Sequence, residues 1–255
     1  MPDENNGGTM RWLMGVLAAT VMLSGCSQIS AQMSGEQAST ATESSSFDPD
    51  AGPILVTQQW GVVDGMLSVV VRNTSQRTLR FANAVITARD EQDVIVASSA
   101  VVTDGTCCDV VDLPAGEKFG FYFDVGSSAD AIAKLDVAYQ DVAWATASGK
   151  PDATFTAKPT GIDKNSVGAV VVADVVTTGA RTPQVSAQAF LNDKDGKFIA
   201  VVSGRWDCFV PGTRQIRMQL FHPVPPGTVV EAIRVHPVEH DPARPSPDCS
   251  YRNES

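Results

Sequence analysis

Apolar and polar positions alternate along most of the chain in short runs that are separated by turn-forming residues. The runs cover 65–73, 80–90, 94–102, 118–125 and 133–144, then 168–176, 183–193, 197–204, 216–221 and 229–239. Alternation with a period of two predicts β-strands, and strands spaced by roughly 10–15 residues indicate an all-β sandwich fold. A short helical turn is expected only within 125–134.

The second set of runs repeats the order of the first. The turn "VPGTRQ" (210–215) stands where "LPAGE" (113–117) stands in the first set, and "KDG" replaces "EQD" at an earlier turn. A repeat of about 100 residues is the size of a small domain rather than of a solenoid unit. The sequence therefore predicts two tandem immunoglobulin-like β-sandwich domains, at 53–148 and 152–255.

The first 52 residues have a different character. The apolar run 12–23 is shorter than the roughly 20 residues that span a bilayer, and it has the length of a secretory signal core. Translation from Met10 would place the basic Arg11 directly before this core. Residues 27–52 are rich in Ser, Thr and Gln with few apolar positions, which predicts a disordered tether.

The apolar run ends in "LSGC" (23–26), which resembles the lipobox of bacterial lipoproteins. The resemblance implies that residues 1–26 form a lipoprotein signal and that Cys26 begins the mature chain and carries diacylglycerol. The expected location is the outer face of the cytoplasmic membrane, held there by the lipid anchor. Abundant Ala and Val with few Lys residues suggest an actinobacterial type of envelope.

Val71 and Asn73 stand at the end of one predicted strand, and Asp90 closes the next, with Asn192 as its expected counterpart. In these positions both halves resemble the FxLYD type of immunoglobulin-like domain found in exported bacterial proteins. Pro-Gly turns at 114–116 and 211–212 complete the pattern, although "ITARD" and "QAFLN" replace the signature itself. The resemblance implies a fold and brings no shared catalytic residues.

Charge and missing motifs narrow the expected function. The formal net charge is −10, which disfavours nucleic acid as a partner. No order of residues typical of an activated nucleophile and no phosphate-binding loop is present, so no catalytic residue and no cofactor are expected. The sequence predicts a non-enzymatic lipoprotein that binds an unknown protein or cell-envelope partner.

Four cysteines remain once Cys26 is assigned to lipid. Outside the cytosol an even number favours disulfides, and four cysteines allow three connectivities. The preferred pairing joins Cys208 to Cys249 and leaves Cys107 and Cys108 as a vicinal pair or as free thiols. The rival pairing joins Cys107 or Cys108 to the second half.

The alternative function is an extracytoplasmic metal- or small-ligand-binding lipoprotein. "HPVEH" (236–240) has the H-x-x-E-H spacing of a zinc protease, but Pro237 opposes the helix that this motif requires. A non-catalytic site formed by His236, His240 and Cys249 is the form that this alternative takes.

Two further patterns are interpreted structurally. "NDKDGK" (192–197) imitates the start of a calcium loop, but it lacks the closing glutamate and is expected to form a turn. Phe119, Phe121 and Phe123 share one face of a predicted strand and are expected in the core.

Overall fold

The computed structural model describes residues 54–101, 107–146, 152–239 and 247–249. In these ranges the protein is all-β, as the alternation predicts, with antiparallel sheets and two short 3-10 helices, η1 and η2. We call residues 54–146 half 1, and we call residues 152–239 together with 247–249 half 2. The described residues of both halves belong to one compact unit.

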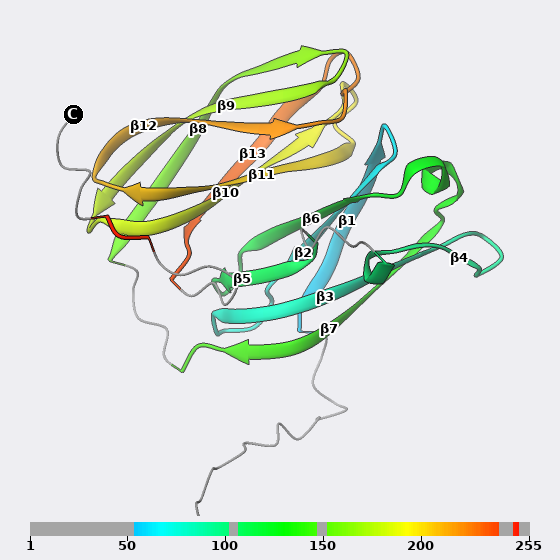
Figure 1. Cartoon of the computed structure of the whole chain (residues 1–255), viewed down its shortest axis with the longest axis horizontal. Coiled ribbons are helices and arrows are strands. Elements are labelled where there is room, and N and C mark those ends of the chain that lie inside the picture. Colours follow the sequence, from blue (N-terminus) through cyan, green and yellow to red (C-terminus); the bar gives the residue numbers. More distant parts are fainter. Residues whose placement is uncertain (1–53, 102–106, 147–151, 240–246, 250–255) are drawn as a thin grey trace, which may run out of the picture. The chain divides into compact units, whose positions relative to one another are not determined.

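Half 1 consists of two facing sheets (Figure 1). Its elements are β1 (Val56–Val63), β2 (Met66–Arg72), β3 (Leu79–Arg89), β4 (Ile95–Ser98), η1 (Ser99–Val101), β5 (Asp109–Leu113), β6 (Lys118–Asp124), η2 (Gly126–Ala131) and β7 (Lys134–Trp144). One sheet has the order β1-β2-β6. In the other sheet β3 pairs with β7 along one edge, and with β5 and then β4 along the other.

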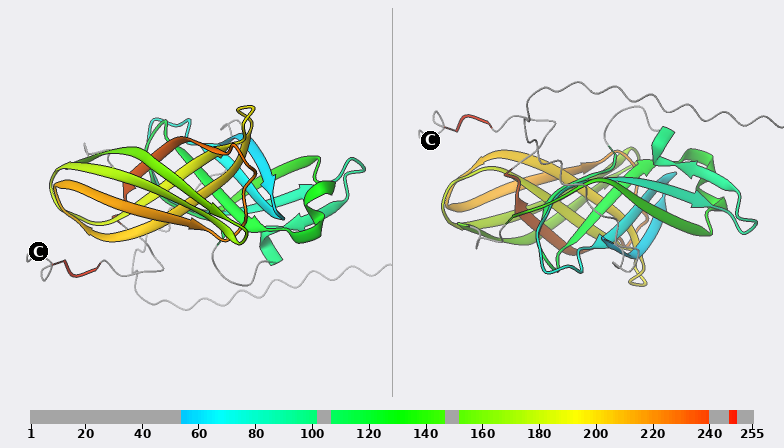
Figure 2. Two further views of the ribbon diagram at one scale, coloured as in Figure 1. Left: turned by 90° about the horizontal axis from the view of Figure 1, so that it is seen from above. Right: turned by 90° about the horizontal axis from the view of Figure 1, so that it is seen from below.

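Half 2 has the same strand order, and Figure 2 shows its strands as two layers. Its strands are β8 (Ala153–Asn165), β9 (Gly168–Gly179), β10 (Thr182–Asn192), β11 (Phe198–Phe209), β12 (Gly212–Leu220) and β13 (Val229–Pro237). The sheet β8-β9-β12 corresponds to β1-β2-β6, and the sheet β11-β10-β13 corresponds to the sheet around β3.

The turn after β3 and the turn after β10 have the same hydrogen bonds. Asp90 Oδ1 accepts from the backbone N–H groups two and four residues later, each at 2.9 Å. Asp193 Oδ1 accepts from its own second and fourth following N–H groups, also at 2.9 Å. The expectation that Asn192 is the counterpart of Asp90 is therefore wrong. Asp193 fills this position because only a residue just beyond the strand end can bond the turn in this way.

Each half has its own cluster of buried apolar side chains. Phe119, Phe121 and Phe123 lie in the cluster of half 1, as their alternation predicts. Val63 and Met66, at the end of β1 and the start of β2, belong to the cluster of half 2. The two cores therefore meet at the β1–β2 turn.

The sheet β1-β2-β6 packs its second face against the sheet β11-β10-β13. Gln188 on β10 donates to the Gly120 carbonyl and accepts from the Gly120 N–H, both at 2.8 Å. Ser68 Oγ accepts from Val201 N at 3.1 Å. A Cβ at Gly120 would lie 2.5 Å from a Val201 methyl, so this contact requires glycine. Strands buried on both faces read as nearly continuous apolar runs, which explains "MLSVVV" (66–71).

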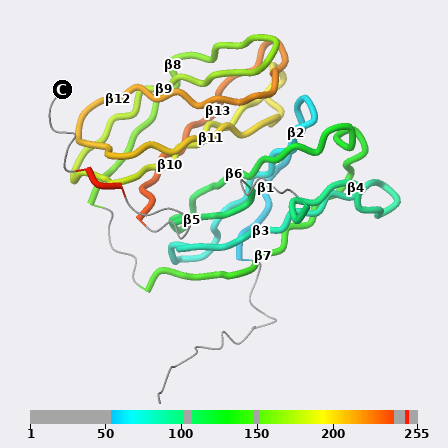
Figure 3. Tube along the Cα trace, in the orientation of Figure 1, coloured from blue at the N-terminus to red at the C-terminus, as the bar shows by residue number. Residues whose placement is uncertain are grey.

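Two separate strands, β4 and β5, pair with one edge of β3, whereas the single strand β11 pairs with the corresponding edge of β10 (Figure 3). The sequence predicts one strand over 94–102, but β4 ends at Ser98 and η1 follows. Ser99 Oγ accepts from Ile86 N, and the Cys108 carbonyl accepts from Ala84 N, both at 2.9 Å. These two groups accept hydrogen bonds from β3 on its edge opposite β7, between the residues that pair with β5 and those that pair with β4.

Candidate functional site

One end of each half collects three of its connections. In half 1 these are residues 64–65 between β1 and β2, 90–94 between β3 and β4, and 125–133 between β6 and β7. In half 2 the corresponding connections are 166–167, 193–197 and 221–228. Strand register places each set together, since Met66 lies opposite Asp124 and Arg89 lies opposite Lys134. We call these six connections and the strand residues next to them the loop end.

The loop end exposes large apolar side chains. Of eight such residues in the described part of the chain, five lie here: Val94, Ile95, Val167, Phe221 and Val229. Phe221 is 75% exposed and Val167 is 71% exposed. Apolar side chains scattered singly over a surface need no explanation, but a concentration of them marks a site of association. The sequence analysis did not identify these residues as a surface, because all but Val167 lie at the ends of predicted strands, where an apolar residue is expected to be buried.

Contacts join the loop end of half 2 to that of half 1. The backbone of Gly168 lies against that of Phe221, because a Cβ on the glycine would be 3.3 Å from the Phe221 Cα. The next residue, His222, has Nδ1 2.9 Å from the carbonyl oxygen of Asp64. The exposed apolar residues of half 2 therefore adjoin the β1–β2 turn of half 1.

The same surface continues across half 1. The Gly65 carbonyl accepts from Val125 N at 2.8 Å, which brings the β6–β7 connection to the β1–β2 turn. Where that connection ends, Lys134 Nζ lies 3.5 Å from Asp93 Oδ1, next to the exposed Val94. A chain of contacts therefore links the connections of the loop end from Val167 in half 2 to Val94 in half 1.

His236 lies away from the loop end, in the contact between the halves. It is 5% exposed, its ring centre is 6.4 Å from that of Phe119, and its Nε2 has no hydrogen-bond partner among the described residues. Burial, and to a lesser extent the positive charge of Arg205, lowers the pKa of His236 to about 4. A neutral imidazole packed between two sheets is a structural residue of this contact.

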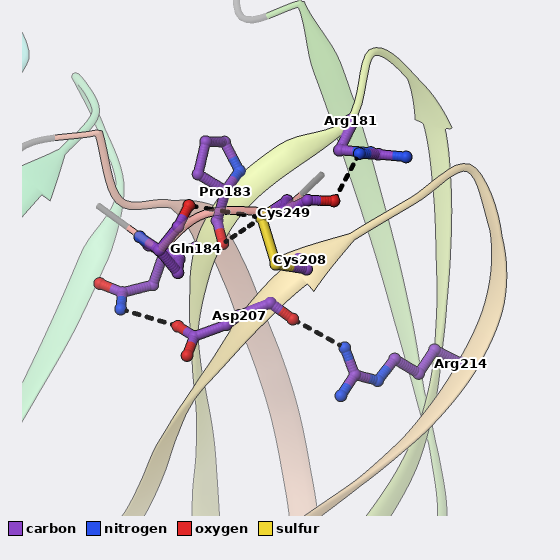
Figure 4. Close-up of a disulfide and its surroundings, with 8 residues drawn as sticks. Arg181, Pro183, Gln184, Asp207, Cys208, Arg214 and Cys249 are labelled. Carbon is purple, nitrogen blue, oxygen red and sulfur yellow. Dashed lines mark hydrogen bonds between the residues drawn. A yellow bond between two sulfur atoms is a disulfide. The ribbon is translucent and has the colours of Figure 1, made fainter. Parts of the chain in front are cut away.

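The structure pairs Cys208 with Cys249, the connectivity that the sequence favoured (Figure 4). Arg181 Nη1 donates to the Cys249 carbonyl at 2.8 Å and holds the same segment. A sulfur in a disulfide offers no thiolate to a metal. Of the suggested metal ligands, His236 is buried, Cys249 is bonded to Cys208, and His240 lies outside the described residues. Among the residues that the structure describes, no group of three or more His, Cys, Asp or Glu side chains is arranged to hold a metal ion.

Cys107 and Cys108 are paired with each other. Cys108 is buried in the core of half 1, and Cys107 packs against that core. The pair lies directly before β5 and packs against the core of half 1, which gives it a structural role.

Asn73, assigned to the strand end in the FxLYD resemblance, is fully buried at the other end of half 1. Its Nδ2 lies 2.8 Å from the Arg77 carbonyl and 3.1 Å from that of Leu113. It joins the β2–β3 loop to the turn before β6 beside a pocket of about 340 Å³. The residue therefore ties two loops together.

Cys26 and the expected tether lie outside the described residues. Within the described ranges, no helix has the length and apolar character needed to cross a bilayer. No protein-family model matches the chain. No curated protein matches it either.

Proposed function

We propose that this chain is a lipid-anchored extracytoplasmic binding protein without catalytic activity, and that its loop end contacts a partner protein of the cell envelope. The observation that carries the proposal is the concentration of exposed apolar side chains at that end, led by Phe221. In β-sandwich proteins the connections at one end of the sheets are a common binding surface.

The direction of β1 indicates how the loop end would be oriented relative to the lipid anchor. The expected tether precedes residue 54 and joins the start of β1, whereas the β1–β2 turn at Asp64 belongs to the loop end. An eight-residue strand spans roughly 26 Å at about 3.3 Å per residue. A chain anchored through Cys26 would thus present its loop end on the side opposite to its attachment.

The anchor is tested by mass spectrometry of the mature protein from a bacterial host that processes lipoproteins. We expect the chain to begin at Cys26 with an attached diacylglycerol, and we expect Cys26→Ala to abolish that modification. A mature chain that begins elsewhere would overturn the anchor and leave the binding surface to be tested separately.

The binding surface is tested by site-specific photo-cross-linking in intact cells. A photoreactive residue replaces Val94 or Phe221 at the loop end, or Val176 or Val210 elsewhere on the surface. We expect discrete protein adducts from the first two positions and none from the controls. Equal labelling from all four positions would contradict the proposal.

A further inference from the structure

The two sets of connections at the loop end differ in charge. The three connections of half 1 contain Asp64, Asp90, Glu91, Asp93 and Asp130, and no Lys or Arg. The net charge of this set is −4 when Asp124, Arg89 and Lys134 at the adjoining strand ends are included. In half 2 the same connections carry two aspartates and two lysines, and they balance. The loop end is thus acidic across half 1 and apolar and neutral across half 2.

Some of these carboxylates also have structural roles. Asp90 Oδ1 holds its turn, and Asp93 lies 3.5 Å from Lys134. Glu91 and Asp130 are exposed, as are the apolar residues Val94 and Ile95 of the same half. Charges at the rim of an apolar contact select a partner of opposite sign and accelerate its association.

From this charge pattern, and resting on the proposed function above, we infer that the partner presents a cationic polypeptide segment that also carries large apolar side chains. Its Lys or Arg residues would face the acidic connections of half 1, and its apolar side chains would cover Phe221 and Val167. Charge repulsion disfavours an anionic lipid surface or a nucleic acid at the same place.

The experiment measures binding of short fluorescent peptides to the full chain purified in neutral detergent. Three peptides alternate Lys with Leu, Glu with Leu, and Lys with Ser. Vesicles of phosphatidylcholine with phosphatidylglycerol serve as the lipid probe. Two loop-end variants are compared with the wild type: Phe221→Ser with Val94→Ser, and Glu91→Gln with Asp130→Asn. The matched controls are Val176→Ser with Val210→Ser, and Asp152→Asn with Asp174→Asn, all of them away from the loop end.

The inference predicts that the Lys-Leu peptide binds the wild type most tightly, and that each loop-end variant weakens it about tenfold. The control variants should leave its affinity unchanged, and salt should weaken it. Circular dichroism of each variant confirms that the strands remain folded.

Other results would overturn the inference in distinguishable ways. If the Glu-Leu peptide binds as tightly as the Lys-Leu peptide, a cationic partner is excluded, but the loop end can still be a docking surface. Equal binding of the Lys-Ser peptide, or equal loss in the control variants, would show only diffuse attraction to an acidic protein. Binding to the vesicles with no peptide binding would favour a lipid surface. If no probe binds, the inference is wrong, whereas the cross-linking at Val94 and Phe221 still decides the proposed function.

Discussion

The outward faces of two equivalent sheets show how the halves differ. When the halves are aligned on Asp90 and Asp193, Asn83 on β3 corresponds to Ser186 on β10. Their cross-strand neighbours are Gln140 and His236. Gln140 is exposed and His236 is buried, because the other half covers the sheet of half 2 and leaves that of half 1 open.

This asymmetry explains the chemistry of each face. The covered face of β10 carries Ser186, Gln188 and Phe190, all of them buried. Gln188 is acceptable there because both ends of its amide are bonded to Gly120. Half 1 covers the sheet β11-β10-β13 of half 2, whereas half 2 does not cover the sheet around β3, so two halves with one strand order have different surfaces.

The largest contrast concerns the two disulfides. Cys208–Cys249 closes a loop of 41 residues, whereas Cys107 and Cys108 are adjacent. Chain-entropy arguments predict that Cys208→Ser with Cys249→Ser lowers the free energy of unfolding by about 2–4 kcal/mol. Cys107→Ser with Cys108→Ser removes almost no loop entropy and should cost less. Urea denaturation of both variants provides the comparison, and equal losses would contradict it.

The burial of His236, in contrast to the exposed Gln140, should make the stability of the protein depend on pH. Its pKa of about 4 lies below the usual 6.5, so the unfolded chain binds a proton that the folded chain does not. This contribution to stability is complete above pH 6.5 and is lost as the pH falls towards 4, by an amount on the order of 3 kcal/mol. His236→Gln should flatten the pH dependence of unfolding in this window. An unchanged slope would show that other groups cause it.

The next largest effect is expected at Ser99, whose hydroxyl accepts a hydrogen bond from β3 between its pairings with β4 and β5. Ser99→Ala leaves the buried Ile86 N–H without its acceptor and should cost about 1–3 kcal/mol. Ser98→Ala is the matched control, because Ser98 Oγ accepts an exposed N–H at 3.3 Å and should cost less than about 0.5 kcal/mol. In half 2 the backbone of β11 fills this position, so no side chain there should matter equally. Similar losses in the two serine variants would contradict this role for Ser99.

The smallest effect is expected at Tyr139 on β7. Its hydroxyl is buried with no hydrogen-bond partner among the described residues, and burial raises the pKa of the phenol. The equivalent residue on β13 is Val235, which has no hydroxyl. Tyr139→Phe should therefore raise the free energy of unfolding by about 1 kcal/mol. Destabilisation in thermal melts would show that the hydroxyl has a partner in solution.

Strands with clear period-two alternation were the most predictable part of the fold. The alternation in 80–90 and in 118–125 predicts β3 and β6 to within one residue at each end. The sequence analysis missed three strands, β1, β5 and β8. Of these, β5 is short, and β8 is an exposed edge strand that contains Pro159. The exposure of Phe221 and Val229 was missed because both lie at the ends of predicted strands, and Val167 was missed because a single apolar residue in a turn has no periodicity.

The sequence by itself determined the all-β class, the short strands and the Asp-based turns, because these depend on contacts between residues close in the chain. Only the tertiary structure decided which face of each sheet is covered, and hence why His236 is buried and Gln140 is exposed. It also decided that connections more than a hundred residues apart contact each other, so that an acidic set in half 1 adjoins an apolar set in half 2. Such placement depends on how the sheets pack, and local pattern carries no record of it.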